Sequence, residues 1–171
     1  MRSILFALFL APALAAQQPR DLSGSWVLDR QPPAADSTAV AAGQTAAGPR
    51  TAGTRQLSLL IGIAGAVPAF SVTQTDTSVT VTNADGFSYL LRPDGPELQL
   101  TIADSLVVRY RARWDGSFLQ VEFRPNGGGK VTERYQLADS ELYLRVDVTV
   151  EYERFRRQES RLYRRNGSAG T

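Results

Sequence analysis

The chain has 171 residues, with 19 basic and 17 acidic side chains, and it contains neither histidine nor cysteine. These absences exclude a histidine general base, a cysteine nucleophile, disulfide bonds and zinc sites built from Cys and His. A formal net charge of +2 also lacks the large basic excess of a nucleic-acid-binding protein, so we expect no nucleic-acid partner.

Residues 1–15 have the pattern of a secretory signal peptide. Arg2 precedes an apolar run over residues 4–14, and small residues then occupy the two positions that a signal peptidase reads. We expect cleavage after Ala15 or Ala16. A membrane anchor is the alternative, but a spanning helix needs roughly 20 apolar residues and this run is too short. The pattern predicts a soluble, extracytoplasmic protein without a transmembrane segment after cleavage, periplasmic or secreted and of the bacterial type that lacks disulfides.

The rest of the chain divides by composition. Residues 16–30 contain a first strand, and residues 31–55 are a low-complexity stretch of Ala, Gly, Pro, Thr and Gln, which predicts a mobile loop. The body of the fold is expected over residues 56–165. Within it, residues 56–66 fit either a short helix or a buried strand, and we favour the helix. Residues 166–171 are predicted to be a disordered tail.

The body alternates apolar and polar residues between regularly spaced turn signals, which is typical of a β-meander. We expect about ten strands: one at Trp26, eight or so between Ala69 and Val150, and one from Phe155 to Arg164. An open sheet would leave two exposed edges, so the first and last strands are predicted to meet and close it. The turn signals are Asp76-Thr77, Asp85-Gly86, Asp94-Gly95, Asp104-Ser105, Asp115-Gly116, Asn126-Gly127 and Asp139-Ser140.

The start of the first strand carries a resemblance. Gly24-Ser25-Trp26 resembles the Gly-x-Trp opening of lipocalin-type (calycin) barrels. That resemblance implies a tryptophan at the base of an all-β, antiparallel, up-and-down barrel of about 8–10 strands, packed beneath a late arginine, here Arg161 or Arg164. It also implies a small apolar ligand. The wider layout is similar to small lipocalin-like proteins exported by bacteria, over residues 22–26, 111–116, 131–135 and 161–165.

Motifs for catalysis or cofactors are not found in the sequence. Residues 126–130 read Asn-Gly-Gly-Gly-Lys, but a phosphate-binding loop needs Ser or Thr after the lysine, and Val131 stands there. A hairpin tip is the better interpretation. Glu122 and Glu133 could approach one another as a carboxylate pair, yet we interpret them as solvent-facing, together with the arginines of 154–165. We therefore predict no enzyme activity, no cofactor and no metal.

The candidate binding residues are the aromatic and amide side chains expected inside the barrel. Two interpretations stay open: a cavity for a small hydrophobic ligand, or a filled core in an extracytoplasmic interaction or structural module. The first is the leading hypothesis. The predicted interior set is Trp26, Gln74, Tyr89, Tyr110, Trp114, Phe123 and Tyr135.

Overall fold

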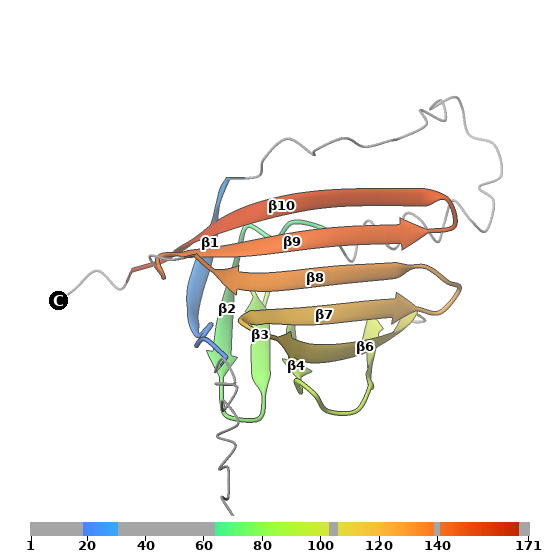
Figure 1. Cartoon of the computed structure of the whole chain (residues 1–171), viewed down its shortest axis with the longest axis horizontal. Coiled ribbons are helices and arrows are strands. Elements are labelled where there is room, and N and C mark those ends of the chain that lie inside the picture. The colour runs from blue at the N-terminus through green and yellow to red at the C-terminus, as the bar shows by residue number, and fades with distance from the viewer. Residues whose placement is uncertain (1–18, 31–63, 103–105, 139–140, 168–171) are drawn as a thin grey trace, which may run out of the picture.

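The computed structural model describes residues 19–30, 64–102, 106–138 and 141–167 (Figure 1). The regular structure in these residues is all β, as the alternating sequence predicts. Among them, no helix is long and apolar enough to cross a membrane. The described strands are β1 (Gly24–Arg30), β2 (Ala69–Gln74), β3 (Val79–Asn83), β4 (Ser88–Leu91), β5 (Leu98–Ile102), β6 (Leu106–Asp115), β7 (Phe118–Pro125), β8 (Lys130–Leu137), β9 (Tyr143–Tyr152) and β10 (Phe155–Arg165).

These strands form one 10-stranded sheet in the order β4-β3-β2-β1-β10-β9-β8-β7-β6-β5. All the neighbouring pairs are antiparallel, and chain neighbours pair as hairpins on either side of the β1–β10 junction. At that junction Val27 pairs with Arg164 and Leu28 with Tyr163. The prediction that the first and last strands meet is therefore confirmed.

The sheet curls into a nearly closed barrel whose two edge strands are β4 and β5. The neighbouring strand β6 crosses this opening with a side chain: the Tyr110 hydroxyl donates to the Leu90 carbonyl oxygen of β4 at 2.8 Å. The loop between β4 and β5 is also tied to β6, because the Asp94 amide donates to the Ala112 carbonyl oxygen at 3.0 Å. These two bonds hold the free edges near one another without a strand ladder.

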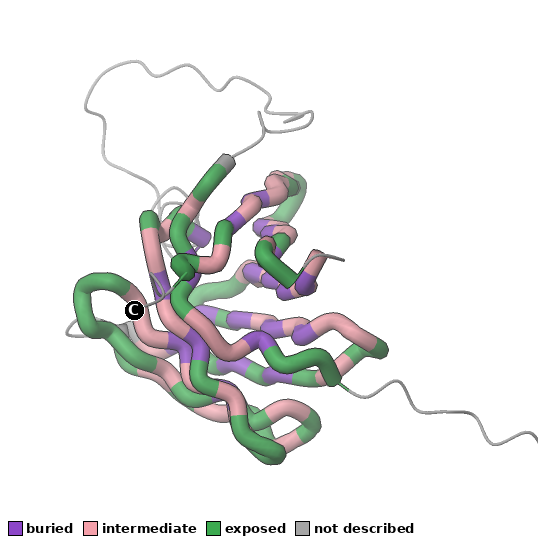
Figure 2. The backbone as a smooth tube through the Cα atoms, turned by 90° about the vertical axis from the view of Figure 1, so that its left-hand side faces the viewer, coloured by how far each residue is buried: buried purple, intermediate pink, exposed green. Residues whose placement is uncertain are grey.

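The barrel has two halves of different shape. Figure 1 shows the short strands β1–β4 running across the direction of the long strands β6–β10. Buried positions alternate with intermediate or exposed ones along the strands of both halves (Figure 2), most regularly in β7, β8 and β9. Each inward Val, Leu or Phe contributes roughly 1.5–3 kcal/mol when fully buried, so the alternation itself stabilises the closed sheet.

Most of the apolar residues that the alternation places on the inner face are buried, including Val108, Val121 and Val148. The same alternation, extended one step further, places Phe87 and Leu142 inward, but both are exposed. The reason is that each stands one residue before its strand begins, because β4 starts at Ser88 and β9 at Tyr143. The alternation is reliable inside a strand and ends with it.

The glycine run after β7 forms a hairpin tip. Gly127, Gly128 and Gly129 all have positive φ, at 104°, 99° and 82°. Residues with side chains rarely adopt this backbone, which explains three glycines in succession. The tip joins the paired strands β7 and β8, as a hairpin predicts and a phosphate-binding loop does not.

Several predictions concern residues outside the described part. These are the signal segment 1–15, the low-complexity stretch 31–55, residues 56–63 of the candidate helix, the turn signals Asp104-Ser105 and Asp139-Ser140, and residues 168–171 of the tail. The remaining residues of that segment, 64–66, contain a turn position and no helix.

Candidate functional site

The base of the barrel is built around Trp26. Its indole is fully buried, and Nε1 donates to the Leu22 carbonyl oxygen at 3.1 Å. The guanidinium of Arg165 lies over the ring, 4.5 Å from its centroid, at the β10 position that pairs with Trp26. Arg165 also donates to the Ser23 carbonyl oxygen at 2.6 Å and to that of Glu141 at 3.1 Å. A guanidinium that lies over an indole ring, with its own N–H groups hydrogen-bonded to carbonyl oxygens, makes a favourable cation–π contact.

The arginine at the base is therefore neither Arg161 nor Arg164, the two expected from the resemblance. Successive side chains of a strand point to opposite faces, so Arg164 faces outward and is exposed, whereas Arg165 faces inward. Arg161 faces inward but lies four residues earlier, where it meets other partners.

Gly24 is fitted to this base. Its φ is +147°, and a Cβ at this position would lie 2.6 Å from Nη1 of Arg165. A side chain would therefore displace the guanidinium from the tryptophan. This contact gives the Gly-x-Trp pattern a physical reason in this chain.

Two predicted interior residues lie at the ends of strands. The Gln74 side-chain oxygen accepts from the Leu22 amide at 3.0 Å, and the Gln74 amide donates to the Ser23 hydroxyl at 3.0 Å. Gln74 thus ties the end of β2 to the segment before β1. Trp114 is half-buried near the end of β6, opposite Leu119.

The other predicted aromatic residues meet inside the barrel. The ring of Phe123 lies 6.0 Å from that of Tyr89 and 5.9 Å from that of Tyr110. The ring of Phe70, which was not predicted as a site residue, lies 6.5 Å from Tyr135 and 4.8 Å from Tyr163. Because Phe70 and Tyr89 come from the short-strand half, these contacts fill part of the space between the two halves.

A buried carboxylate lies beside these rings. Glu133 is 7% exposed and accepts a hydrogen bond from the Tyr135 hydroxyl at 2.5 Å. The Tyr135 and Tyr89 hydroxyls are 3.4 Å apart. Burial raises the pKa of the Glu133 carboxyl, and the Tyr135 hydrogen bond and the charge of Arg161 act against that rise. Burial also raises the pKa of both tyrosines, so their hydroxyls keep their protons.

A second group of charges faces inward from β10. Arg161 is 3% exposed and donates through Nη2 to the Glu159 carboxylate and the Ala64 carbonyl oxygen, and through Nη1 to the Gly65 carbonyl oxygen at 3.3 Å. The Glu159 side chain is 6% exposed and also binds Arg157 at 2.6 Å. The Nε atom of Arg161 is buried with no hydrogen-bond partner among the described residues.

The interpretation of Glu133 and Arg161 as solvent-facing is therefore wrong. Glu133 lies two residues from Val131 and Tyr135, and Arg161 lies two residues from Tyr163, all of them buried. Residues two positions apart in a strand point to the same face, so the apolar neighbours two positions away could have placed Glu133 and Arg161 inward. Glu122 faces outward and binds Arg124 at 2.6 Å, so it cannot pair with Glu133.

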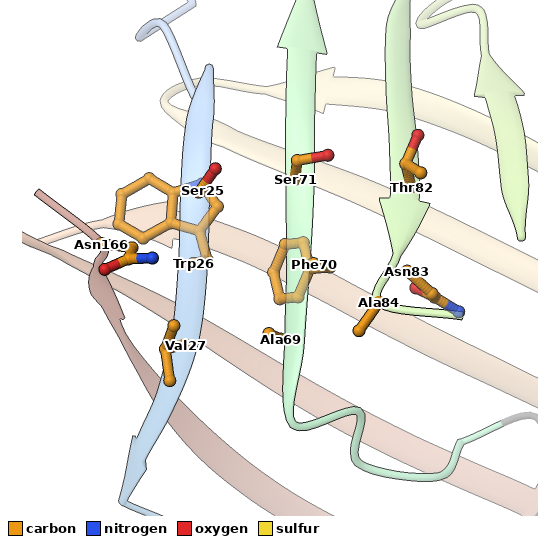
Figure 3. A pocket seen from close by; sticks show the side chains of 10 residues that line it. All are labelled: Ser25, Trp26, Val27, Ala69, Phe70, Ser71, Thr82, Asn83, Ala84 and Asn166. Carbon is orange, nitrogen blue, oxygen red and sulfur yellow. The ribbon is translucent and has the colours of Figure 1, made fainter. Parts of the chain in front are cut away.

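Some inward side chains remain partly accessible beside the opening between β4 and β5. Tyr89, Leu98 and Leu100 are half-buried and pack against the core. A second accessible feature is an open pocket of about 260 Å³ over β1, β2 and β3 (Figure 3). Its described lining contains hydroxyl, amide and small apolar side chains together with the aromatic rings of Trp26 and Phe70, but no charged side chains. No cluster of acidic residues that could hold a metal ion occurs in the described ranges.

No protein-family model and no curated protein matches this chain. Solved structures match in fold. A secretory abundant heat soluble (SAHS) protein from Ramazzottius varieornatus has a TM-score of 0.57 at 12% identity, covering 89% of this chain and 100% of that one. Fatty-acid-binding protein 1 of Echinococcus granulosus has a TM-score of 0.54 at 12% identity, covering 85% and 98%. Zebrafish ileal bile-acid-binding protein, complexed with cholic acid, has a TM-score of 0.51 at 13% identity, covering 84% and 97%. At these identities the likeness shows the fold alone: this chain has an antiparallel β-barrel fold similar to that of these three structures.

Proposed function

We propose that this protein is an exported, non-enzymatic carrier that binds one small, mainly apolar molecule inside its barrel. The observation that carries the proposal is the inner surface itself. An apolar and aromatic wall surrounds a few inward polar groups, namely Glu133, Tyr135, Glu159 and Arg161. Binding sites for small molecules combine an apolar lining with a few such convergent polar groups.

The polar groups favour a carrier because buried charges are costly. Replacing a buried ion pair with apolar side chains of similar volume is often neutral or stabilising, so a barrel that needs nothing but a core gains little from Arg161 and Glu159. The neighbours in fold support the same function, since two of them are named for binding fatty acids and bile acids. Export rests on the signal pattern of residues 1–15, and the non-enzymatic role on the absence of histidine and cysteine.

A second candidate is an extracytoplasmic interaction module with a filled core. The contacts of Phe70 with Tyr135 and Tyr163 favour it, because they close part of the interior. So do the exposed apolar side chains Val27 and Leu90, on the outer surface of the short-strand half.

Binding of apolar probes separates the two candidates. The neutral dye N-phenyl-1-naphthylamine, fatty acids, isoprenoids and small aromatics are titrated against the protein purified from the envelope fraction. Tryptophan fluorescence and thermal melts are recorded together. A carrier gives a saturable signal and a raised melting temperature, because a ligand that binds only the folded state stabilises it.

Two variants assign the signal to the interior. Tyr110→Asp places an unpaired charge in the wall and is expected to abolish binding. Tyr143→Asp, on a partly exposed position of β9, is the matched control and is expected to bind as wild type does. No saturable response to any apolar class would reject the carrier and favour the interaction module. The intact mass of the same preparation tests export, with the chain expected to begin at Ala16 or Gln17.

A further inference from the structure

We infer that the barrel selects neutral apolar molecules over anionic ones, with Glu159 as the residue that determines this specificity. The inference rests on the proposed carrier function and names its ligand class: an aliphatic chain or ring system that ends in a hydroxyl or carbonyl group. It follows from how the inward charges are already paired.

The Nη2 group of Arg161, the deeply buried arginine, already has its hydrogen-bond partners. An arginine holds a carboxylate most strongly through two parallel N–H bonds. Both of the paired N–H edges that a guanidinium offers include Nη2, and Nη2 of Arg161 already donates to Glu159 and to the Ala64 carbonyl oxygen. A two-point bond to a ligand carboxylate would require Arg161 to release Glu159.

The inward charges also balance. Apart from Arg165, whose N–H groups are held at the base, Arg157 and Arg161 flank Glu159, and Glu133 supplies the second carboxylate, so two positive groups face two negative ones. Arg157 is 33% exposed and therefore partly solvated, which leaves Arg161 as the deeply buried cation. A ligand carboxylate would be a third negative charge in a poorly solvated space, where like charges repel strongly.

The groups left over suit a neutral ligand. The Nε–H of Arg161 has no partner among the described residues and can donate one bond to a hydroxyl or carbonyl oxygen. Tyr89, whose hydroxyl lies 3.4 Å from that of Tyr135, can donate to or accept from a ligand hydroxyl, whereas Tyr135 donates to Glu133 and can accept one. A neutral head group is bound by single hydrogen bonds of this kind and leaves the Arg161–Glu159 pair intact.

The test compares ligands that differ in the head group alone. Hexadecanol, methyl hexadecanoate and hexadecanoic acid compete at pH 8 for wild-type protein loaded with N-phenyl-1-naphthylamine. We expect the alcohol to displace the dye at a concentration at least tenfold lower than the acid does. Equal or tighter binding of the acid would overturn the inference while leaving the carrier function intact. A dye that does not bind at all would reject the carrier function itself, and the inference with it.

A charge-neutralising variant tests the role of Glu159. Glu159→Gln keeps the size of the side chain but leaves Arg161 with an unbalanced charge, so the acid is expected to bind at least tenfold more tightly and the alcohol unchanged. Glu151→Gln is the matched control, because Glu151 lies on β9 next to β10 but binds Lys130 on the outer surface. An unchanged ratio of acid to alcohol in a folded Glu159→Gln protein would overturn the role of Glu159. If this variant does not fold, the wild-type ratio still decides the ligand class.

Discussion

Arg161 and Arg165 lie on the same face of β10, four residues apart, and their guanidinium groups make different kinds of contact. Arg165 lies over Trp26 and gives its N–H groups to carbonyl oxygens of the segments that close the base. Arg161 is more deeply buried and shares a carboxylate with Arg157, and its Nε has no hydrogen-bond partner among the described residues. At the base, Arg165 is held by uncharged groups, namely the Trp26 ring and two carbonyl oxygens. In the interior, Arg161 is paired with a carboxylate and its Nε–H can still donate a hydrogen bond.

This difference separates stability from specificity along a single strand. Removing a group at the base removes packing that nothing else replaces. Removing a group in the interior changes a charge balance, which a second substitution can restore. The predictions below test this distinction, from the largest expected effect to the smallest.

The largest effect is expected from Trp26→Ala. The indole is fully buried beneath Arg165, so its loss removes a large apolar surface and leaves a cavity. We expect the free energy of unfolding to fall by about 3–5 kcal/mol. Urea denaturation measures it. Trp114→Ala is the control, because Trp114 is half-buried at a strand end and should cost clearly less. Equal losses for the two variants would mean that the base is not a special contact.

Arg161→Leu is expected to cost about 3 kcal/mol, at the lower end for breaking a buried pair, because Glu159 keeps Arg157 as a partner. Adding Glu159→Leu should recover most of that loss, since the remaining Arg157 is partly exposed and can be solvated. The described hydrogen bonds of Arg165 are to carbonyl oxygens and not to Glu159, so Glu159→Leu should not rescue Arg165→Leu. Urea denaturation of the six proteins, namely wild type, the three single variants and the two double variants, measures both cycles. Purely additive losses at Arg161 and Glu159 would contradict the charge-balance account.

Local sequence signals predicted the fold well. Alternation placed the eight strands between Ala69 and Val150 near their observed positions, and Asp-Gly and Asn-Gly pairs marked the turns, because side-chain direction and positive φ are both properties of a few adjacent residues. The meeting of the first and last strands followed from the need to protect sheet edges.

The candidate site was harder to predict, because it depends on register and on exceptions to a general rule. Whether Arg161, Arg164 or Arg165 reaches Trp26 is decided by the pairing of β1 with β10, which involves residues more than a hundred positions apart. Glu133 and Arg161 stand at inward positions, but charged side chains are rarely buried, and that expectation outweighed the strand parity. A charged residue two positions away from inward apolar residues of the same strand is therefore the sequence signal for a buried charge in such a barrel.

Gly24→Ala tests the close fit at the base. The added Cβ would lie 2.6 Å from Arg165 Nη1, at a backbone φ of +147° that favours glycine. We expect a loss of about 1–3 kcal/mol from backbone strain, and a further loss from displacement of the guanidinium. Gly86→Ala is the matched control, since its φ is +85° but a Cβ there meets nothing within 4 Å. Chemical denaturation of both variants compares them. A smaller loss at Gly24 than at Gly86 would show that Arg165 moves aside without cost.

The smallest effect is expected from Glu133→Gln, and it depends on pH. Burial raises the pKa of Glu133, so the folded protein holds this proton at pH values where the unfolded chain has released it. The free energy of unfolding of wild type therefore falls as pH rises above about 4.5, at about 1.4 kcal/mol per unit of pKa difference, until the folded carboxyl also ionises. A glutamine does not titrate, and its amide oxygen can still accept the Tyr135 hydrogen bond. The variant should gain stability relative to wild type between pH 4 and pH 8.

Glu151→Gln should show the opposite trend in the same experiment. The hydrogen bond from Lys130 lowers the pKa of Glu151, so this carboxylate contributes stability above its usual pKa and loses it as the pH falls. Its variant should therefore lose stability relative to wild type as pH rises from below about 4 to about 5, and the difference should then stay constant up to pH 8. Urea denaturation at closely spaced pH values measures both slopes. Parallel pH profiles for the two variants would contradict the buried position of Glu133, because folding would then shift the pKa of both carboxyl groups in the same direction.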